Sequence, residues 1–124
     1  MEIASYRDLK VWQSAIELAE ATYSLTRDFP NSELYGLTAQ SRRAAISVAA
    51  NIAEGHGRET TGAFIQFLRT SQGSLKELET HLIIAQRLDF ASPAKVEAIL
   101  ARCDELGRML RGLIRSLQQK QADD

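Results

Sequence analysis

The sequence lacks the features that several protein classes require. Its single cysteine, Cys103, excludes an internal disulfide and fits a reducing compartment. No apolar run approaches the roughly 18 residues that a membrane-spanning helix needs. The first residues, MEIASYRDLK, have neither the basic start nor the apolar core of a signal peptide. We therefore expect a cytoplasmic protein that makes no membrane contact.

Proline, aromatic residues and an excess of charge of one sign are also scarce. The 124 residues include two prolines and 6% aromatic residues, while Ala and Leu are abundant, which favours helices over strands. The length suits one domain, residues 1–124, and the hydrophobic content of 44% is ordinary for a globular chain. The net charge of −1 argues against a dedicated non-specific nucleic-acid binder but leaves room for a local basic patch.

Apolar residues at helical spacing predict four amphipathic helices joined by short turns. These helices cover residues 8–28, 32–55, 60–88 and 93–118, and the polar tail beyond them is expected to fray. Asp8 is the expected N-cap of the first helix, and Ser92 followed by Pro93 is a strong start signal for the fourth. Short connections place successive helices antiparallel, so the sequence predicts an all-α, up-down four-helix bundle.

Glycines at two places have different expected roles. Gly55-His56-Gly57 forms the exit of the second predicted helix. Gly73 lies in the middle of the third, where it costs roughly 0.5–1 kcal/mol relative to Ala. We expect Gly73 to mark the close approach of another backbone.

One narrow stripe on the second predicted helix is polar, although the helix is otherwise apolar nearly all round. At about 100° per residue, six polar side chains fall within about 80° of arc and form this polar stripe: Gln40, Arg43, Ser47, Asn51, Glu54 and Arg58. The stripe is either a solvated face or a hydrogen-bonded network against other protein, and its lack of Lys favours the network. We expect it to meet Ser74 and Glu77, in the same subunit or a neighbouring one, and to specify packing and assembly.

The sequence contains no recognisable catalytic, nucleotide-binding or metal-binding pattern. His56 and His81 have no further ligands at metal spacing, and Glu77 with His81 is better explained as a local contact. Cys103 occupies a core heptad position and is interpreted as a small buried hydrophobe. An enzyme that uses the acid and amide groups of the polar stripe is the weakest hypothesis, because no nucleophile, metal set or phosphate loop accompanies them. We expect no catalytic residue, no cofactor, no metal and no small-molecule substrate.

Two basic features remain. Arg42 lies on the second predicted helix, roughly opposite the polar stripe. The fourth helix carries Arg108, Arg111, Arg115 and Lys120, with no acidic residue between Leu106 and Ala122. Cations near a helix C-terminus can simply complement the helix dipole. The alternative is a surface that contacts the phosphates of RNA or DNA.

The second helix also resembles a family signature. The pattern Arg43-x-x-x-Ser47-Val48-x-x-Asn51-Ile52-Ala53-Glu54-Gly55-x-x-Arg58 is similar to that of the bacterial four helix bundle protein family, whose founding members are encoded by intervening sequences within 23S ribosomal RNA genes. The resemblance covers about residues 6–90 and continues through Tyr6-x-x-Leu9-x-x-Trp12, Phe29-Pro30-x-x-Glu33 and Gly73-Ser74-Leu75-x-Glu77-Leu78-Glu79.

The resemblance implies a four-helix bundle that forms a homo-oligomer, a pentamer above other states, with no known enzymatic activity. The accessory protein of diversity-generating retroelements is similar to this family and works with nucleic acid through a basic surface. Two functional hypotheses follow. The first is a non-enzymatic protein that assembles with itself as a homopentamer and whose biochemical role is undefined. The alternative is an RNA- or DNA-binding accessory module that uses a local basic surface.

Overall fold

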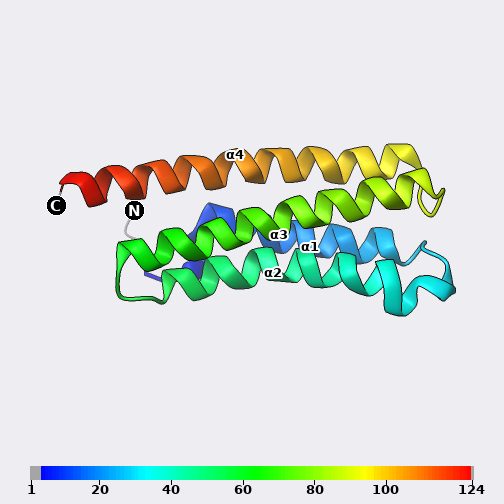
Figure 1. The fold of residues 1–124 in the computed structure, drawn as a ribbon, viewed down its shortest axis with the longest axis horizontal. Coiled ribbons are helices and arrows are strands. Elements are labelled where there is room, and N and C mark those ends of the chain that lie inside the picture. The colour runs from blue at the N-terminus through cyan, green and yellow to red at the C-terminus, as the bar shows by residue number, and fades with distance from the viewer. Residues whose placement is uncertain (1–3, 124) are drawn as a thin grey trace.

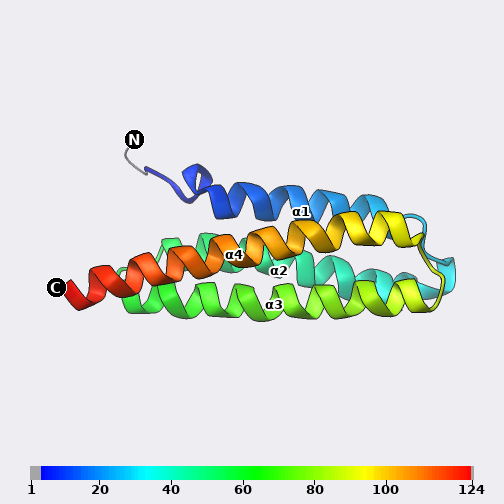
Figure 2. The same ribbon diagram turned by 90° about the horizontal axis from the view of Figure 1, so that it is seen from above.

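The computed structural model describes residues 4–123, which form an antiparallel bundle of four helices (Figures 1 and 2). The helices are α1 (Lys10–Thr26), α2 (Ala39–His56), α3 (Thr61–Arg87) and α4 (Pro93–Asp123). Each packs beside its two neighbours, in the cyclic order α1, α2, α3, α4, so that α2 and α4 lie diagonally opposite (Figures 1 and 2). The predicted all-α four-helix bundle is confirmed. No helix within residues 4–123 is long and apolar enough to cross a membrane.

The first helix begins later than predicted. Ser5 and Asp8 form a reciprocal capping box, in which the Asp8 carboxylate accepts a hydrogen bond of 3.1 Å from the Ser5 amide. This box closes a separate 3-10 turn, Tyr6–Asp8, and does not start α1. The expectation that Asp8 caps the first helix is therefore wrong, because the extended Leu9 separates the turn from Lys10.

The second helix also begins later, at Ala39, where the sequence pattern predicted residue 32. A 3-10 turn (Asn31–Glu33) and a π-helical turn (Leu34–Thr38) precede it. Within the π-helical turn, the backbone is non-helical at Gly36 (φ −104°, ψ −114°). The Glu33 carboxylate accepts a hydrogen bond of 3.1 Å from the Leu37 amide, which caps the chain after the break. The break turns Tyr35 outward, with 91% of its surface exposed.

The two later helices follow their predicted starts more closely. Thr60 accepts a hydrogen bond from the Ala63 amide, and Ser92 accepts one from the Lys95 amide. The predicted end of α4 at residue 118 is wrong, because the helix continues to Asp123. Its last turn is held by a hydrogen bond of 3.1 Å from Gln119 to Asp123.

The core consists of aliphatic side chains from all four helices. Among the fully buried are Leu18, Val48, Ile52, Leu68, Leu75, Leu78, Leu82, Val96, Leu106 and Leu110. The buried hydroxyls of Thr22, Thr26 and Ser71 donate to backbone carbonyls, whereas the buried Ser41 hydroxyl has no partner within the described residues. One of these bonds joins two helices: Ser71 on α3 donates to the Val48 carbonyl on α2 at 2.8 Å. This bond fixes the register of α2 against α3 in the middle of the core.

The helices α2 and α3 approach each other closely at Gly55. A Cβ atom placed there would be 2.5 Å from the Phe67 Cβ and 3.0 Å from the Phe64 ring. Gly73, for which the close approach was predicted, is exposed, and a Cβ atom there would meet nothing within 4 Å. That expectation is wrong because Gly73 lies on the outer side of α3.

The two glycines therefore predict opposite effects of the same substitution. Gly55→Ala forces α2 away from Phe67 and should lower the free energy of unfolding by about 1–3 kcal/mol. Gly73→Ala, the matched control, should raise it by about 0.5–1 kcal/mol, because Ala restricts the unfolded chain and suits a helix. Urea unfolding followed by circular dichroism measures both. Equal stability of Gly55→Ala and the unaltered protein would contradict the close approach.

The only cysteine lies in the core between α4 and its neighbours. Cys103 is fully buried, as its heptad position predicted. Burial raises the pKa of the Cys103 thiol from its ordinary 9.0 to about 12, and the negative charge of Glu79 raises it further, against the opposing effect of Lys76. The thiol is therefore protonated and inert at neutral pH.

The raised pKa predicts a slow thiol and a loss of stability in alkali. At pH 8 the folded protein should not react with Ellman's reagent on the timescale on which the unfolded chain reacts fully. Stability contributed by the protonated thiol is complete below pH 9 and is lost as the pH rises towards 12, because only the unfolded state ionises in that window. The non-titrating variant Cys103→Val should show a shallower alkaline decline. Rapid labelling of the folded protein would contradict the burial.

Candidate functional site

The structure brings part of the polar stripe together at the contact between α2 and α3. The hydroxyls of Ser47 and Ser74 share a hydrogen bond of 2.8 Å. The Asn51 amide donates to the Ser47 carbonyl at 2.9 Å and to the Ser47 hydroxyl at 3.0 Å. All three side chains are half-buried. These residues, Ser47, Asn51 and Ser74, are called the seam cluster below.

The remaining members of the stripe lie on the surface. Gln40 and Arg43 are exposed, and Glu54 forms an exposed i, i+4 ion pair of 3.0 Å with Arg58. The Arg58 guanidinium also lies 4.8 Å from the centre of the Phe67 ring. Glu77 does not reach the stripe; its carboxylate lies 3.7 Å from the His81 ring on its own helix. Ser47 and Asn51 thus lie at the contact between the helices, and the other members of the stripe lie on the open surface.

The open side of α2 carries one large exposed apolar side chain, Ile46, among polar and charged ones. The exposed residues of this side, Gln40, Arg43, Ile46, Ala50 and Glu54, are called the α2 outer face. Ile46 has 47% of its surface exposed, and Leu34 and Tyr35 stand exposed beside the start of the helix. A shallow groove of about 480 Å³ runs between this face and α1, lined by Tyr23, Leu34, Tyr35, Ala39, Arg42, Arg43 and Ile46.

Arg42, which the sequence suggested for phosphate contact, is held in the wall of this groove. Its Nε donates to the Thr26 hydroxyl at 2.9 Å, and its guanidinium lies 4.5 Å from the centre of the Tyr23 ring. The side chain is only half exposed. Arg42 therefore ties α2 to α1, and its charge is partly committed to those contacts.

The arginines of α4 are also divided by the structure. Arg108 forms an ion pair of 3.2 Å with Asp104, and Lys120 lines a separate groove near the start of α3. Arg111 and Arg115 instead line a groove of about 230 Å³ between α3 and α4, which is called the basic groove: Arg69, Gln72, Arg111, Ile114, Arg115 and Gln118. Arg69 was missed by the sequence analysis, because its place beside Arg111 depends on the register between the two helices.

No arrangement suited to catalysis is found in the described residues. Within residues 4–123, no three His, Cys, Asp or Glu side chains gather as a metal site requires. His81 points its Nδ1 into the protein interior without a hydrogen-bond partner in the described part of the chain. Cys103 is buried and protonated. What the structure offers instead is two surfaces: the α2 outer face and the basic groove.

Comparisons with known proteins place the chain in a family. A crystal structure of a protein with unknown function from the S23 ribosomal protein family of Bacteroides thetaiotaomicron shares the fold, with a TM-score of 0.78 and 23% sequence identity. The alignment covers 84% of this chain and 97% of that chain. A search of curated proteins gives no match. Residues 7–112 match the family described as 23S rRNA-intervening sequence protein, and because that match spans most of the chain, the protein belongs to this family.

Proposed function

We propose that the protein acts, without enzymatic activity, by assembling with copies of itself through the α2 outer face. The observation that carries the proposal is the exposed apolar group around this face: Tyr23, Leu34, Tyr35 and Ile46. Ordinary surface helices present charged and polar side chains to water. Here α2 is covered by protein on its inner side only, so its outer side is available to a partner.

The chemistry of the face fits a second copy of the chain. Tyr and Arg are enriched in protein interfaces, and Tyr35, Tyr23 and Arg43 surround the groove beside α2. The small side chain of Ala50 allows a neighbouring surface to approach the helix closely. A closed ring of identical subunits joins two different faces of each copy, and the pentamer implied by the family resemblance would be built in this way. The single buried thiol suits the reducing cytoplasm.

If the protein self-assembles, its mass in solution should be several times that of one chain. A single substitution in the interface should dissociate the oligomer. Light scattering after gel filtration should give about five times the chain mass of 13.8 kDa. Ile46→Glu places a charge in the apolar face and should yield monomers that keep the helical circular dichroism of the unaltered protein. Ser116→Glu, which adds the same charge at an exposed polar position on α4, is the control and should leave the mass unchanged. A monomeric unaltered protein, or an Ile46→Glu variant of unaltered mass, would refute the proposal.

The seam cluster supports the assembly by fixing α2 against α3. Asn51→Leu removes two hydrogen bonds to Ser47 and should lower the free energy of unfolding by about 1 kcal/mol. Gln40→Leu, on the exposed part of the same stripe, should change it by less than about 0.5 kcal/mol. Urea unfolding of both variants at one protein concentration measures the difference. Equal effects of the two substitutions would mean that the stripe acts as one solvated face.

A further inference from the structure

We propose that the basic groove binds the phosphate backbone of a nucleic acid. The groove lies between α3 and α4, and α4 is diagonally opposite α2, so the surface is distinct from the α2 outer face (Figures 1 and 2). It presents three guanidinium groups, from Arg69, Arg111 and Arg115, on exposed side chains. Guanidinium groups bind phosphate through paired N–H donors.

Two segments without acidic residues create this surface. Residues 60–76 contain Arg69 and Lys76, and residues 106–122 contain Arg108, Arg111, Arg115 and Lys120, but neither segment has an Asp or a Glu. The antiparallel pairing of α3 and α4 lays the two segments side by side, with Leu75 beside Gly107 and Gly62 beside Gln121. A chain of net charge −1 thereby concentrates cations on one face.

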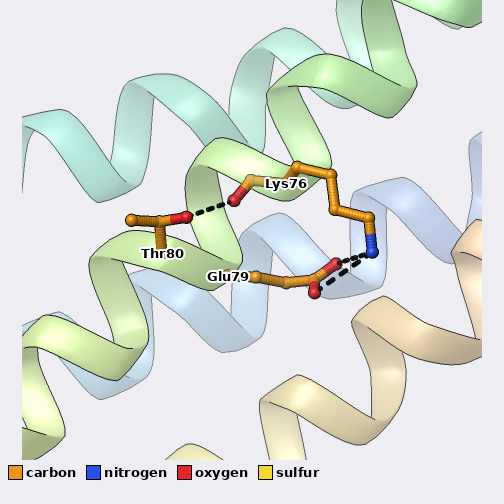
Figure 3. Close-up of polar contacts among 3 residues, drawn as sticks. All are labelled: Lys76, Glu79 and Thr80. Carbon is orange, nitrogen blue, oxygen red and sulfur yellow. Dashed lines mark hydrogen bonds and ion pairs between the residues drawn. The ribbon is translucent and has the colours of Figure 1, made fainter.

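Two ion pairs lie beside this face and leave its centre charged. Lys76 is paired with Glu79 at 3.3 Å, as Figure 3 shows, and Arg108 is paired with Asp104 at 3.2 Å. No ion pair within residues 4–123 involves the three arginines of the basic groove. Three like charges around one small groove repel one another, and an anion there would relieve the repulsion.

The observed length of α4 removes the simpler explanation for its arginines. Cations stabilise a helix dipole only within the last turn. Because α4 continues to Asp123, Lys120 is the cation in its last turn, whereas Arg111 and Arg115 lie two to three turns earlier. Their positive charge is therefore not accounted for by the helix end.

The shape of the groove favours a nucleic-acid backbone over a free ion or a peptide. The three arginines are exposed, and a site for an isolated phosphate ion would enclose it more fully. Arg111 and Arg115 lie one turn of α4 apart, about 6 Å at 1.5 Å per residue, and Arg69 lies across the groove on α3, which suits successive phosphates of one strand. The groove offers Gln72 and Gln118 as further amide donors, and its one apolar lining residue, Ile114, is buried, so it provides no pocket for the side chains of a peptide.

The test is fluorescence anisotropy with the full chain and labelled 20-nucleotide probes of RNA and DNA at several salt concentrations. The unaltered protein should bind at 50 mM salt, and the triple variant Arg69→Gln, Arg111→Gln, Arg115→Gln should bind at least about tenfold more weakly. Its plot of log affinity against log salt should be shallower by about 2, the value expected for three lost phosphate contacts on a single strand. RNA and DNA arms of equal affinity would indicate backbone contact alone.

A charge-matched variant and an acidic polymer control this experiment. Arg7→Gln, Arg27→Gln, Arg87→Gln removes three exposed arginines outside the groove and should bind like the unaltered protein. The proposal is overturned if the unaltered protein does not bind, if both triple variants lose affinity equally, or if poly-glutamate competes as well as RNA. Light scattering of each variant shows whether a loss of nucleic-acid binding is due to a loss of self-assembly. Removal of the groove arginines should leave the mass of the oligomer unchanged.

Discussion

The contact between α2 and α3 determines which side of α2 is buried and which is exposed. The helices approach so closely at Gly55 that no side chain fits between it and Phe67, and the Ser71 hydroxyl locks their register through the Val48 carbonyl. A close, fixed approach sets the rotation of α2 about its own axis. That rotation turns Ser47 into contact with Ser74, with Asn51 bonded to Ser47 on the same helix, and leaves Ile46 and Ala50 facing outward. The exposure of Ile46 thus follows from the same contact that stabilises the bundle.

The sequence predicts the fold well because the fold depends on periodicity. The predicted third helix, residues 60–88, differs from the observed Thr61–Arg87 by one residue at each end, since Thr60 and the chain after Arg87 carry clear end signals. The start of α2 could not be predicted in the same way. The apolar period continues through Leu34 and Leu37, and the break at Gly36 depends on a side-chain contact from Glu33 that no periodicity reveals.

The surfaces were harder to predict, because they depend on how the helices are rotated and paired. The sequence pattern assigned Gly55 to a helix exit and Gly73 to a close approach, yet Gly55 lies inside α2 and is the one that touches another helix, since it faces Phe67. Arg69 joins Arg111 and Arg115 through the register of α3 against α4, which the sequence does not specify. Five residues of the polar stripe lie on α2 and Arg58 lies just beyond its end, and the division of the stripe into a half-buried and an exposed part depends on where α3 lies.

The two surfaces reinforce each other if both proposals hold. Assembly through α2 places the α3–α4 side of each copy away from that contact, so an oligomer would carry as many basic grooves as it has subunits. A weak, exposed groove gains strongly from such repetition, because the second and later contacts along one strand become intramolecular. This would allow a protein of net charge −1 to bind a polyanion, since the binding surface is local and repeated. The three unpaired arginines then lower the stability of each subunit, whereas the nucleic-acid binding that they provide becomes strong only in the oligomer.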